Sequence, residues 1–123
     1  MGKLIITVDD EKDIRDSVRV VLQDEGYKIE TAENGNDLLK KLANIKADLI
    51  LLDILMPGLT TREIVTELKK RKIKTPIIFL SVVRLSEAMK KDILKDAHMV
   101  DYIEKPFDNA DLIKRVKKAL AES

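Results

Sequence analysis

The sequence predicts an α/β domain in which helices cover both faces of a five-stranded parallel sheet, a doubly wound fold. Three observations favour this class. Short apolar or alternating runs recur five times along the chain, at 4–8, 27–31, 48–52, 77–80 and 100–103. A segment of helical periodicity follows each run. Strands separated by single helices need parallel crossover connections, and such connections are right-handed.

The composition of each run indicates its place in the sheet. Runs 4–8, 48–52 and 77–80 are continuous and apolar, which is typical of central strands that are covered on both faces. Runs 27–31 and 100–103 contain more polar and charged residues, which favours the two edges of the sheet. This sorting predicts the strand order 2-1-3-4-5, one of the two common orders of doubly wound sheets, and a three-layer sandwich.

Apolar residues at helical spacing mark the five helices that follow the strands. The first helix ends before Gly26, the second begins after an N-cap at Asn34, and the last begins after an N-cap at Asp108. In chain order, the apolar stripes are Ile14, Val18, Val21 and Leu22; Leu38, Leu39 and Leu42; Ile64, Val65 and Leu68; Leu85, Met89 and Ile93; and Leu112, Val116, Ala119 and Leu120.

Length and composition restrict the class of protein. A chain of 123 residues fits one domain over residues 1–123, and it contains no cysteine for disulfides or thiolate metal sites. It has no signal-like start and no apolar stretch near the ~20 residues of a membrane span, so we expect a cytoplasmic protein without membrane contact. The net charge of +1 gives no overall field that would favour nucleic acid. The most basic run, 69–74, is expected to form the last turn of a helix rather than a nucleic-acid patch.

Acidic residues follow two strands that the predicted order makes neighbours. Asp9 and Asp10 follow the first strand, and Asp53 follows the third. Parallel strands end at one edge of the sheet, so these carboxylates are expected to meet there. Two like charges about 4 Å apart repel by roughly 4 kcal/mol at an effective dielectric near 20, so the cluster must take up a proton or bind a cation. A metal site built from carboxylate oxygens, without His or Cys ligands, favours binding of Mg²⁺, and Mn²⁺ or Ca²⁺ could substitute for it.

Two further polar residues are expected at the same edge. Lys105 follows the fifth strand and offers an ammonium group to a phosphoryl oxygen, and Ser81 ends the fourth strand with a hydroxyl group. A cation, an ammonium and a hydroxyl around Asp53 would neutralise the charge of a transferring phosphoryl group. Carboxylates can form aspartyl phosphates. Each residue alone is common in loops and helix caps, but the combination at four strand ends indicates a phosphoryl-transfer site.

Taken together, these residues resemble the response-regulator receiver domain of two-component signalling, in the form of a stand-alone receiver like those of chemotaxis. The resemblance covers essentially the whole chain and implies a flavodoxin-like fold of five βα units. It rests on Val8-Asp9-Asp10-Glu11, on Leu51-Leu52-Asp53-Ile54-Leu55-Met56-Pro57-Gly58, on Ser81, and on Asp101-Tyr102-Ile103-Glu104-Lys105-Pro106-Phe107.

The resemblance implies a role for each site residue. Asp53 would accept a phosphoryl group from a histidine of a sensor kinase or phosphotransfer protein, and Lys105 would pair with a phosphoryl oxygen. Asp10 and Asp53 would ligate Mg²⁺, Asp9 would assist mainly through water, and the backbone carbonyl of Leu55 would complete the protein ligands. The chain would be a switch with slow, Mg²⁺-dependent self-phosphorylation and self-dephosphorylation rather than a conventional enzyme.

The resemblance also implies a conformational switch. Ser81 would move toward the phosphoryl group and Tyr102 would swing inward behind it, which would change the surface of the fourth helix, fifth strand and fifth helix for an output protein. Tyr102 could equally be an edge-strand aromatic that simply packs. The bond between Lys105 and Pro106 would be cis. The kinase and the output protein stay open, and we expect a monomer or a weak dimer.

Three segments of the chain depart from the family pattern. Val82 stands where a small residue is usual, so the approach to Asp53 is expected to be narrower and rapid transfer from small donors is in doubt. His98 and Met99 replace a usual Gly-Ala pair. Thr60 and Thr61 replace an acidic residue or Asn followed by Gly, so the loop after Asp53 is expected to differ. His98, the only histidine of the chain, is expected to be a loop residue.

Two other classes of function compete with a phosphorylation switch. A phosphorylation-independent interaction module would keep the fold while partners bind its surface, but the complete set of charged site residues argues against it. A phosphatase would be expected to carry a second acid beside Asp53, where Ile54 supplies none, and a flavin carrier needs a phosphate-binding loop where Asp9, Asp10 and Glu11 would repel phosphate.

Overall fold

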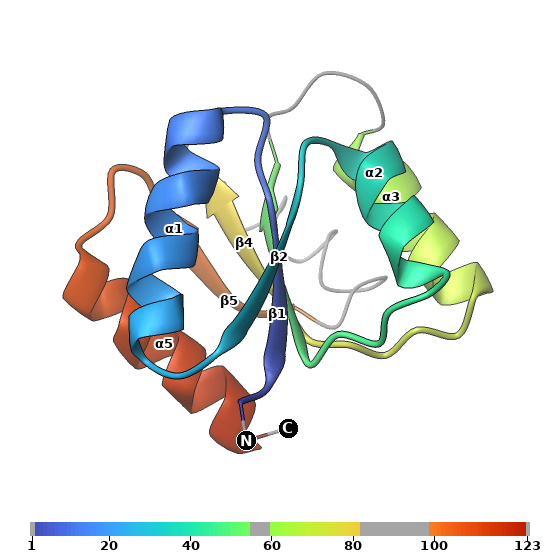
Figure 1. The fold of residues 1–123 in the computed structure, drawn as a ribbon. Helices are drawn as coiled ribbons and strands as arrows, with labels where there is room; N and C mark the ends of the chain where they lie inside the picture. The colour runs from blue at the N-terminus through green and yellow to red at the C-terminus, as the bar shows by residue number, and fades with distance from the viewer. Residues whose placement is uncertain (1, 55–59, 82–98, 123) are drawn as a thin grey trace.

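A five-stranded parallel sheet forms the centre of the molecule (Figure 1). The computed structural model describes residues 2–54, 60–81 and 99–122. Its strands run in the order β2-β1-β3-β4-β5, so the predicted doubly wound, flavodoxin-like class and its strand order are confirmed. The strands are β1 (Leu4–Val8), β2 (Lys28–Ala32), β3 (Leu49–Asp53), β4 (Ile77–Ser81) and β5 (Met99–Glu104).

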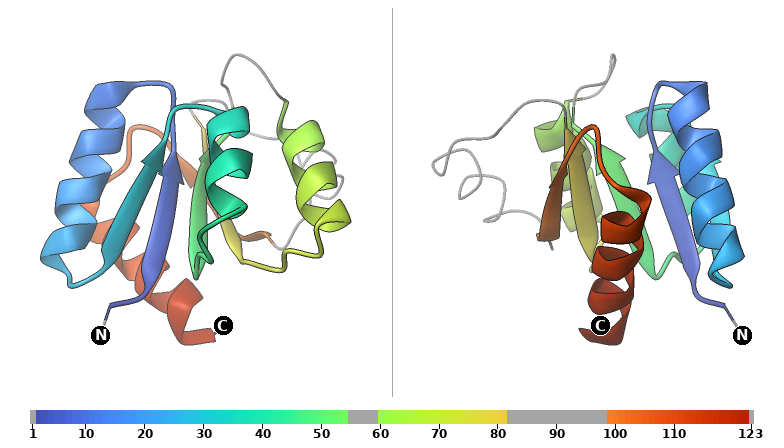
Figure 2. Two further views of the ribbon diagram at one scale, coloured as in Figure 1. Left: turned by 45° about the vertical axis from the view of Figure 1, so that its right-hand side comes forward. Right: turned by 90° about the vertical axis from the view of Figure 1, so that its left-hand side faces the viewer.

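Helices cover both faces of this sheet (Figures 1 and 2). In the described ranges, α1 and α5 lie on one face and α2 and α3 on the other, which gives the predicted three layers. The predicted fourth helix, with Leu85, Met89 and Ile93, lies outside the described residues. Each described helix is too short or too polar to span a bilayer. These helices are α1 (Lys12–Asp24), α2 (Gly35–Leu42), α3 (Thr61–Lys70) and α5 (Asn109–Glu122).

Alternate residues of β3 face opposite helix layers. Leu49 and Leu51 pack in the core under α1 and α5, and Ile50 and Leu52 pack in the core under α2 and α3. All four side chains are fully buried, and complete burial of such a side chain stabilises a fold by about 1.5–3 kcal/mol. The strands β2 and β5 each contain one fully buried residue, which matches their predicted place at the edges. Two apolar cores therefore hold β3 rigidly at the centre of the sheet.

Side-chain caps begin two helices where the sequence predicted them. Asn34 accepts a hydrogen bond from the Asp37 N–H at 2.8 Å at the start of α2. Asp108 accepts one from the Ala110 N–H at 3.0 Å at the start of α5. Each bond satisfies a backbone donor that has no partner within its own helix.

Two helices end in the same backbone motif. After α1, the Gly26 N–H bonds the carbonyl of Gln23 and the Tyr27 N–H bonds that of Leu22, which is a Schellman motif. Gly26 has a φ of 96°, a conformation that glycine adopts without strain. The end of α3 has the same bonding pattern, but Lys72, with a φ of 58°, occupies the glycine position. The predicted stop at Gly26 is confirmed, whereas the left-handed lysine has no signal in the sequence.

The basic run 69–74 belongs only partly to a helix. Its first two lysines occupy the last turn of α3, as predicted, where cations favour the helix dipole. Arg71 follows as the C-cap residue, and its Nη1 donates to the carbonyl of Leu39 at 2.7 Å, which ties α3 to α2. Lys72 and Lys74 extend beyond the helix with exposed side chains. Their placement is therefore not explained by the helix dipole.

Candidate functional site

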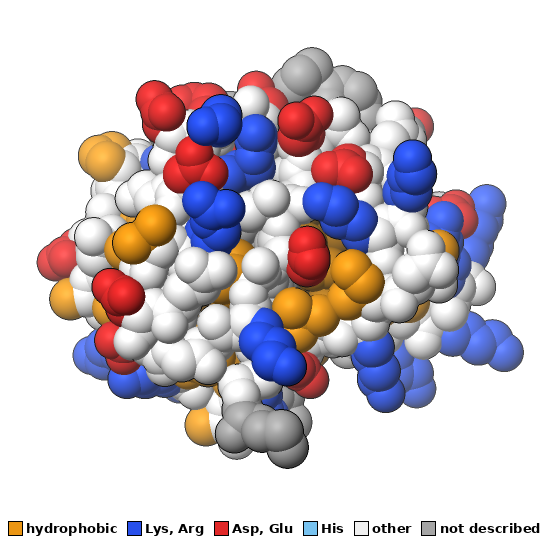
Figure 3. Space-filling model, viewed as in Figure 1, with side chains coloured by type: hydrophobic (Ala, Val, Ile, Leu, Met, Phe, Trp, Pro, Cys, Tyr) orange, Lys and Arg blue, Asp and Glu red, His pale blue; other side chains and the backbone are white. Residues whose placement is uncertain are grey.

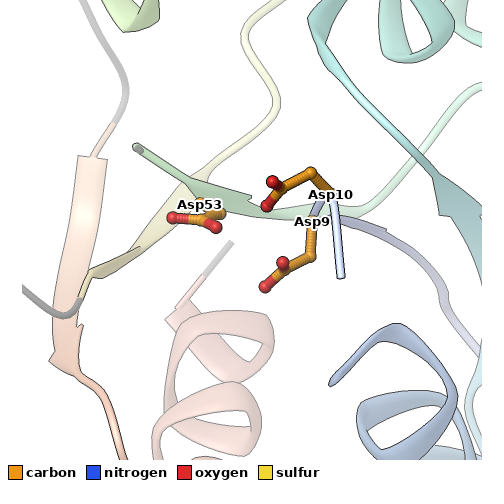
Figure 4. Close-up of side chains that lie close together, drawn as sticks. All are labelled: Asp9, Asp10 and Asp53. Atoms are coloured by element: carbon orange, nitrogen blue, oxygen red, sulfur yellow. The ribbon is translucent and has the colours of Figure 1, made fainter. Parts of the chain in front are cut away.

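Three aspartates meet at the carboxyl edge of the sheet. Asp53 is the last residue of β3, and Asp9 and Asp10 directly follow β1. The parallel register pairs Val8 with Leu52, so the next residues, Asp9 and Asp53, lie side by side. A carboxylate oxygen of each aspartate lies within 4.8 Å of the other two (Figure 4). Asp9 and Asp53 are 0% and 5% exposed, whereas Asp10 is exposed. The structure thus brings together the three carboxylates that the strand order predicted to be neighbours.

Lys105 closes this cluster from the side of β5. Its N–H donates to the carbonyl of Ser81 at 2.7 Å, which holds the residue directly beyond the end of β5. Its Nζ lies 2.5 Å from Asp9 Oδ2 and 3.2 Å from Asp53 Oδ2. Burial lowers the pKa of Lys105, but the hydrogen bond to Asp9 and the charges of Asp53 and Asp9 outweigh burial and raise the pKa above its ordinary value. The ammonium group therefore keeps its charge at neutral pH.

The loop between β1 and α1 is held by contacts to Asp9. The carboxylate of Asp9 accepts a hydrogen bond from the Glu11 N–H at 3.0 Å. Its backbone carbonyl accepts one from Arg15 Nη1 at 2.7 Å, and Arg15 Nη2 lies 4.0 Å from Glu33 Oε1. The Arg15 side chain is 12% exposed. The sequence analysis did not identify Arg15. The only sign of its role in the sequence is a basic residue on α1, the helix that directly follows the acidic residues 9–11.

The charges of the cluster suit a divalent cation. Three carboxylates face one ammonium group, so a net charge of −2 remains, which one Mg²⁺ ion would neutralise. The donors are oxygen atoms only, which matches the preference of Mg²⁺, Mn²⁺ and Ca²⁺. Both oxygens of Asp9 already accept hydrogen bonds, from Glu11 and Lys105. Within the described residues, the Asp10 carboxylate has no hydrogen bond or ion pair, so it is the one most available to a cation.

Ser81 and Tyr102 lie on the face of the sheet that α2 and α3 cover. Ser81 ends β4, is fully buried, and alternates with Phe79, which packs under α2 and α3. Tyr102 pairs with Phe79 in the sheet and packs, partly buried, against the same core. This packing fits the interpretation of Tyr102 as an edge-strand aromatic, and the second rotamer that a switch requires stays a prediction. Lys105 and Pro106 are joined by a cis peptide bond, as the resemblance implied.

The departures from the family pattern lie partly outside the described residues. Leu55, Val82 and His98 lie outside the described residues. Thr61 is described: it is the first residue of α3, and its hydroxyl group donates to the carbonyl of Ile54 at 3.4 Å.

The residue before Thr61 also has a structural role. Thr60 accepts a hydrogen bond from the Glu63 N–H, and the Glu63 side chain accepts one from the Thr60 N–H, which is a capping box. The two threonines therefore begin α3 and connect it to the end of β3.

The chain is similar to known proteins in both sequence and fold. The family model of the response regulator receiver domain matches residues 5–117 of the chain. The structure is similar to that of the chemotaxis protein CheY4 of Vibrio cholerae, with 32% sequence identity and a TM-score of 0.86, over 97% of this chain and 99% of that chain.

Two further solved structures extend the comparison. The response regulator protein TrrA of Thermotoga maritima, solved in complex with Mg²⁺ and BeF, is 39% identical with a TM-score of 0.80, over 95% of this chain and 98% of TrrA. NtrX of Brucella abortus is 31% identical with a TM-score of 0.86, over 99% of this chain but only 28% of NtrX. The match therefore includes both proteins of about this size and part of a much longer one. With a family model that spans nearly all of its residues, the chain belongs to the response regulator receiver domain family of two-component signalling.

Proposed function

We propose that this chain accepts a phosphoryl group on Asp53 from a phosphohistidine of a sensor kinase or phosphotransfer protein. One observation carries the proposal. The nearly buried Asp53 carboxylate has the Lys105 ammonium at 3.2 Å, and the carboxylates of Asp9 and Asp10 lie within 4.8 Å of it. A carboxylate with an ammonium group and an acidic, cation-binding cluster around it is suited to form an acyl phosphate.

In the proposed transfer, an Asp53 oxygen attacks the phosphorus atom. The new P–O bond forms as the P–N bond of the donor breaks, and the imidazole keeps the electron pair of that bond. The Lys105 ammonium, charged at neutral pH, lies where it can pair with a phosphoryl oxygen. The β3 strand, buried in both cores, holds Asp53 in position for attack.

The proposed metal ligands are the carboxylates of Asp10 and Asp53 and the backbone carbonyl of Leu55, a residue outside the described ranges. Asp9 would act mainly through water. When bound, Mg²⁺ supplies positive charge to the phosphoryl oxygens. Asp10 offers a carboxylate without other partners among the described residues, and Glu11 and Lys105 orient Asp9 through its two oxygens. Mn²⁺ or Ca²⁺ would be held by the same oxygen donors.

Phosphorylation is proposed to change the surface of the fourth helix, β5 and α5 for an output protein. Arg115 of α5 donates to Asp101 Oδ1 at 2.6 Å and to the Tyr102 carbonyl at 3.3 Å. These bonds anchor the backbone of β5 to α5. The switch would therefore act mainly through the side chains of Ser81 and Tyr102, by shifting an existing equilibrium.

Intact-protein mass spectrometry tests the proposed phosphoacceptor. Acetyl phosphate with Mg²⁺ should add the mass of one phosphoryl group, and Asp53→Asn should abolish the addition. Because Val82 is expected to narrow the approach to Asp53, beryllofluoride binding, followed by NMR, provides a second test that needs no turnover. Labelling that survives Asp53→Asn would rule out the assignment. Protein that neither binds Mg²⁺ nor takes up either reagent would instead indicate a phosphorylation-independent interaction module.

A further inference from the structure

A groove lies at the amino edge of the sheet, opposite the edge that carries the aspartates. It runs between the loop from α2 to β3 and the loop from α3 to β4, with a volume of about 600 Å³. Its apolar part includes Leu42, Ile45 and Ile73, and its basic part consists of Lys46, Lys72 and Lys74. We call these six residues and the space between them the lysine groove.

Among the residues that the structure describes, none neutralises the positive charge of the lysine groove. None of the residues that line it is acidic. Within the described part of the chain, the side chains of Lys46, Lys72 and Lys74 make no ion pair or hydrogen bond. On the surfaces of α1 and α2, by contrast, Lys12 and Lys41 pair with acidic residues one turn away. Figure 3 shows Lys and Arg side chains gathered at the lower right, around the end of α3 and the loops beside it.

The apolar residues of the lysine groove are only partly buried. Leu42 and Ile73 pack their inner sides against the core under α2 and α3, and Ile45 is also partly exposed. An apolar surface that remains accessible between three lysines can contact an apolar side chain while the lysines contact carboxylates.

The walls of the lysine groove are fixed to each other. The Thr75 hydroxyl group donates to the carbonyl of Ala47 at 3.3 Å, which joins the two loops. Arg71 Nη1 donates to the carbonyl of Leu39 at 2.7 Å, which joins the helices α3 and α2 that precede these loops. A groove with fixed walls loses little conformational entropy when it is occupied, which favours binding.

One lysine of the groove has a backbone conformation that costs stability. Lys72 has a φ of 58°, at the position of a Schellman motif where glycine is usual. The left-handed region is sterically unfavourable for a residue with a Cβ atom. The protein thus places a charged side chain at the rim of the groove where a glycine would be less strained, and such outliers cluster at functional sites.

We propose that the lysine groove binds an acidic, partly apolar peptide segment of a partner protein. Charge complementarity with three lysines that have no partner in the described ranges requires acidic residues, and the apolar part requires one or two aliphatic side chains. A nucleic acid fits less well, because the lining, among the described residues, contains no aromatic side chain on which a base could stack.

This binding would be independent of phosphorylation. The lysine groove lies at the beginning of β3 and β4, whereas Asp53 lies at the end of β3. A partner in the groove would leave Asp53 accessible to its donor. The groove would therefore serve to tether a partner rather than to sense the phosphorylated state, and its affinity should be the same in Asp53→Asn.

Selection of random peptides on the intact protein tests the proposal. A phage-displayed library of twelve-residue peptides is selected on the immobilised chain, and the affinities of the enriched peptides are measured by fluorescence anisotropy. We expect enriched peptides that combine Asp or Glu with Leu or Ile. The double variant Lys72→Glu/Lys74→Glu should weaken their binding by at least about tenfold. The affinity should also fall with added salt.

A matched control separates this site from general attraction to basic protein. Lys3→Glu/Lys28→Glu makes the same change of charge on exposed residues at the starts of β1 and β2 and should leave peptide binding within about twofold of the wild type. Ile45→Ser tests the apolar part and should weaken binding while circular dichroism confirms the fold. Equal loss in both double variants would overturn the proposal, as would enrichment of peptides without acidic residues.

A membrane surface and a second copy of the chain are the remaining alternative occupants of the lysine groove, and each has its own test. Co-sedimentation with phosphatidylglycerol–phosphatidylcholine vesicles that is lost in Lys72→Glu/Lys74→Glu would assign the groove to a membrane surface and overturn the peptide proposal. A dimer that this same double variant dissociates, measured by analytical ultracentrifugation, would assign it to self-association and overturn it as well. We expect neither.

Discussion

The Lys105 ammonium group lies closer to Asp9 than to Asp53, at 2.5 Å from the first carboxylate and 3.2 Å from the second. All three side chains are at most 7% exposed. An ammonium between two buried carboxylates reduces a repulsion that would otherwise be large at these distances. Lys105 is therefore a structural counter-ion of the acidic cluster as well as a proposed phosphoryl contact.

Replacing this counter-ion should destabilise the fold. In Lys105→Met, the free energy of unfolding in the presence of a chelator should fall by about 3 kcal/mol, because two buried carboxylates lose their ion pair. Added Mg²⁺ should restore more stability to the variant than it adds to the wild type. Urea titrations followed by circular dichroism measure both quantities, and Lys118→Met, on an exposed lysine of α5, is the control. A variant as stable as the control would contradict the role of Lys105.

The same ion pair predicts a dependence on alkaline pH. The pKa of Lys105 is raised in the folded protein, because the hydrogen bond to Asp9 and the charges of Asp53 and Asp9 outweigh the effect of burial. A group with a raised folded pKa contributes stability that is complete below the unfolded pKa, about 10.4 for lysine. That contribution is lost as the pH rises through the folded pKa.

The difference in unfolding free energy between wild type and Lys105→Met isolates this effect, because all other titrating groups are common to both proteins. We expect the difference to be constant from pH 7 to about pH 10 and to shrink above it. Chemical denaturation at a series of pH values measures it. A difference that already shrinks between pH 7 and 9 would show that the pKa is lowered rather than raised.

Much of the fold and part of the site followed from local patterns in the sequence. Continuous apolar runs identify central strands because such strands are covered on both faces, and that sorting, together with the common strand orders of doubly wound sheets, makes β1 and β3 neighbours. The meeting of Asp9 and Asp53 follows from that order. The preference of Lys105 for Asp9 does not, because it depends on side-chain geometry across three strands. The contact of Arg15 with the Asp9 carbonyl also joins a helix to a loop in a way that periodicity does not encode.

Removing the exposed carboxylate of the cluster should stabilise the protein and weaken its cation binding. Asp10 lies within 4.8 Å of two other carboxylates and has no ion pair among the described residues. In Asp10→Asn, relief of this repulsion should raise the free energy of unfolding without Mg²⁺ by about 1 kcal/mol, a value discounted for exposure. Calorimetric titration should show weaker Mg²⁺ binding in the same variant.

The control for Asp10 is an acidic residue of the next helix. Asp13→Asn makes the same change of charge in the first turn of α1, where a negative charge favours the helix dipole. It should lower the unfolding free energy by about 0.5 kcal/mol and leave Mg²⁺ binding unchanged. Opposite signs for Asp10 and Asp13 would separate repulsion within the cluster from a general effect of charge. Destabilisation by Asp10→Asn would contradict the repulsion.

Glycine at the end of α3 should stabilise the fold. Lys72 holds a φ of 58° in a Schellman motif whose bonds run from the Lys72 N–H to Lys69 and from the Ile73 N–H to Leu68. Lys72→Gly keeps these bonds and removes the steric cost of the Cβ atom, but it increases the entropy of the unfolded chain. The first effect is larger in the left-handed region, so the unfolding free energy should rise by about 0.5–1 kcal/mol.

Lys72→Ala separates the effect of backbone conformation from that of the lysine side chain. Alanine lacks the charge but keeps the Cβ atom, so Lys72→Ala should stay within about 0.5 kcal/mol of the wild type. Thermal and urea unfolding of the three proteins measure the two steps. If Lys72→Ala stabilises the fold as much as Lys72→Gly, the cost lies in the crowding of positive charge around 69–74 rather than in the backbone. If only glycine stabilises the fold, the cost at Lys72 comes from its backbone conformation. Binding of a partner by the lysine side chain would then account for a lysine at this position.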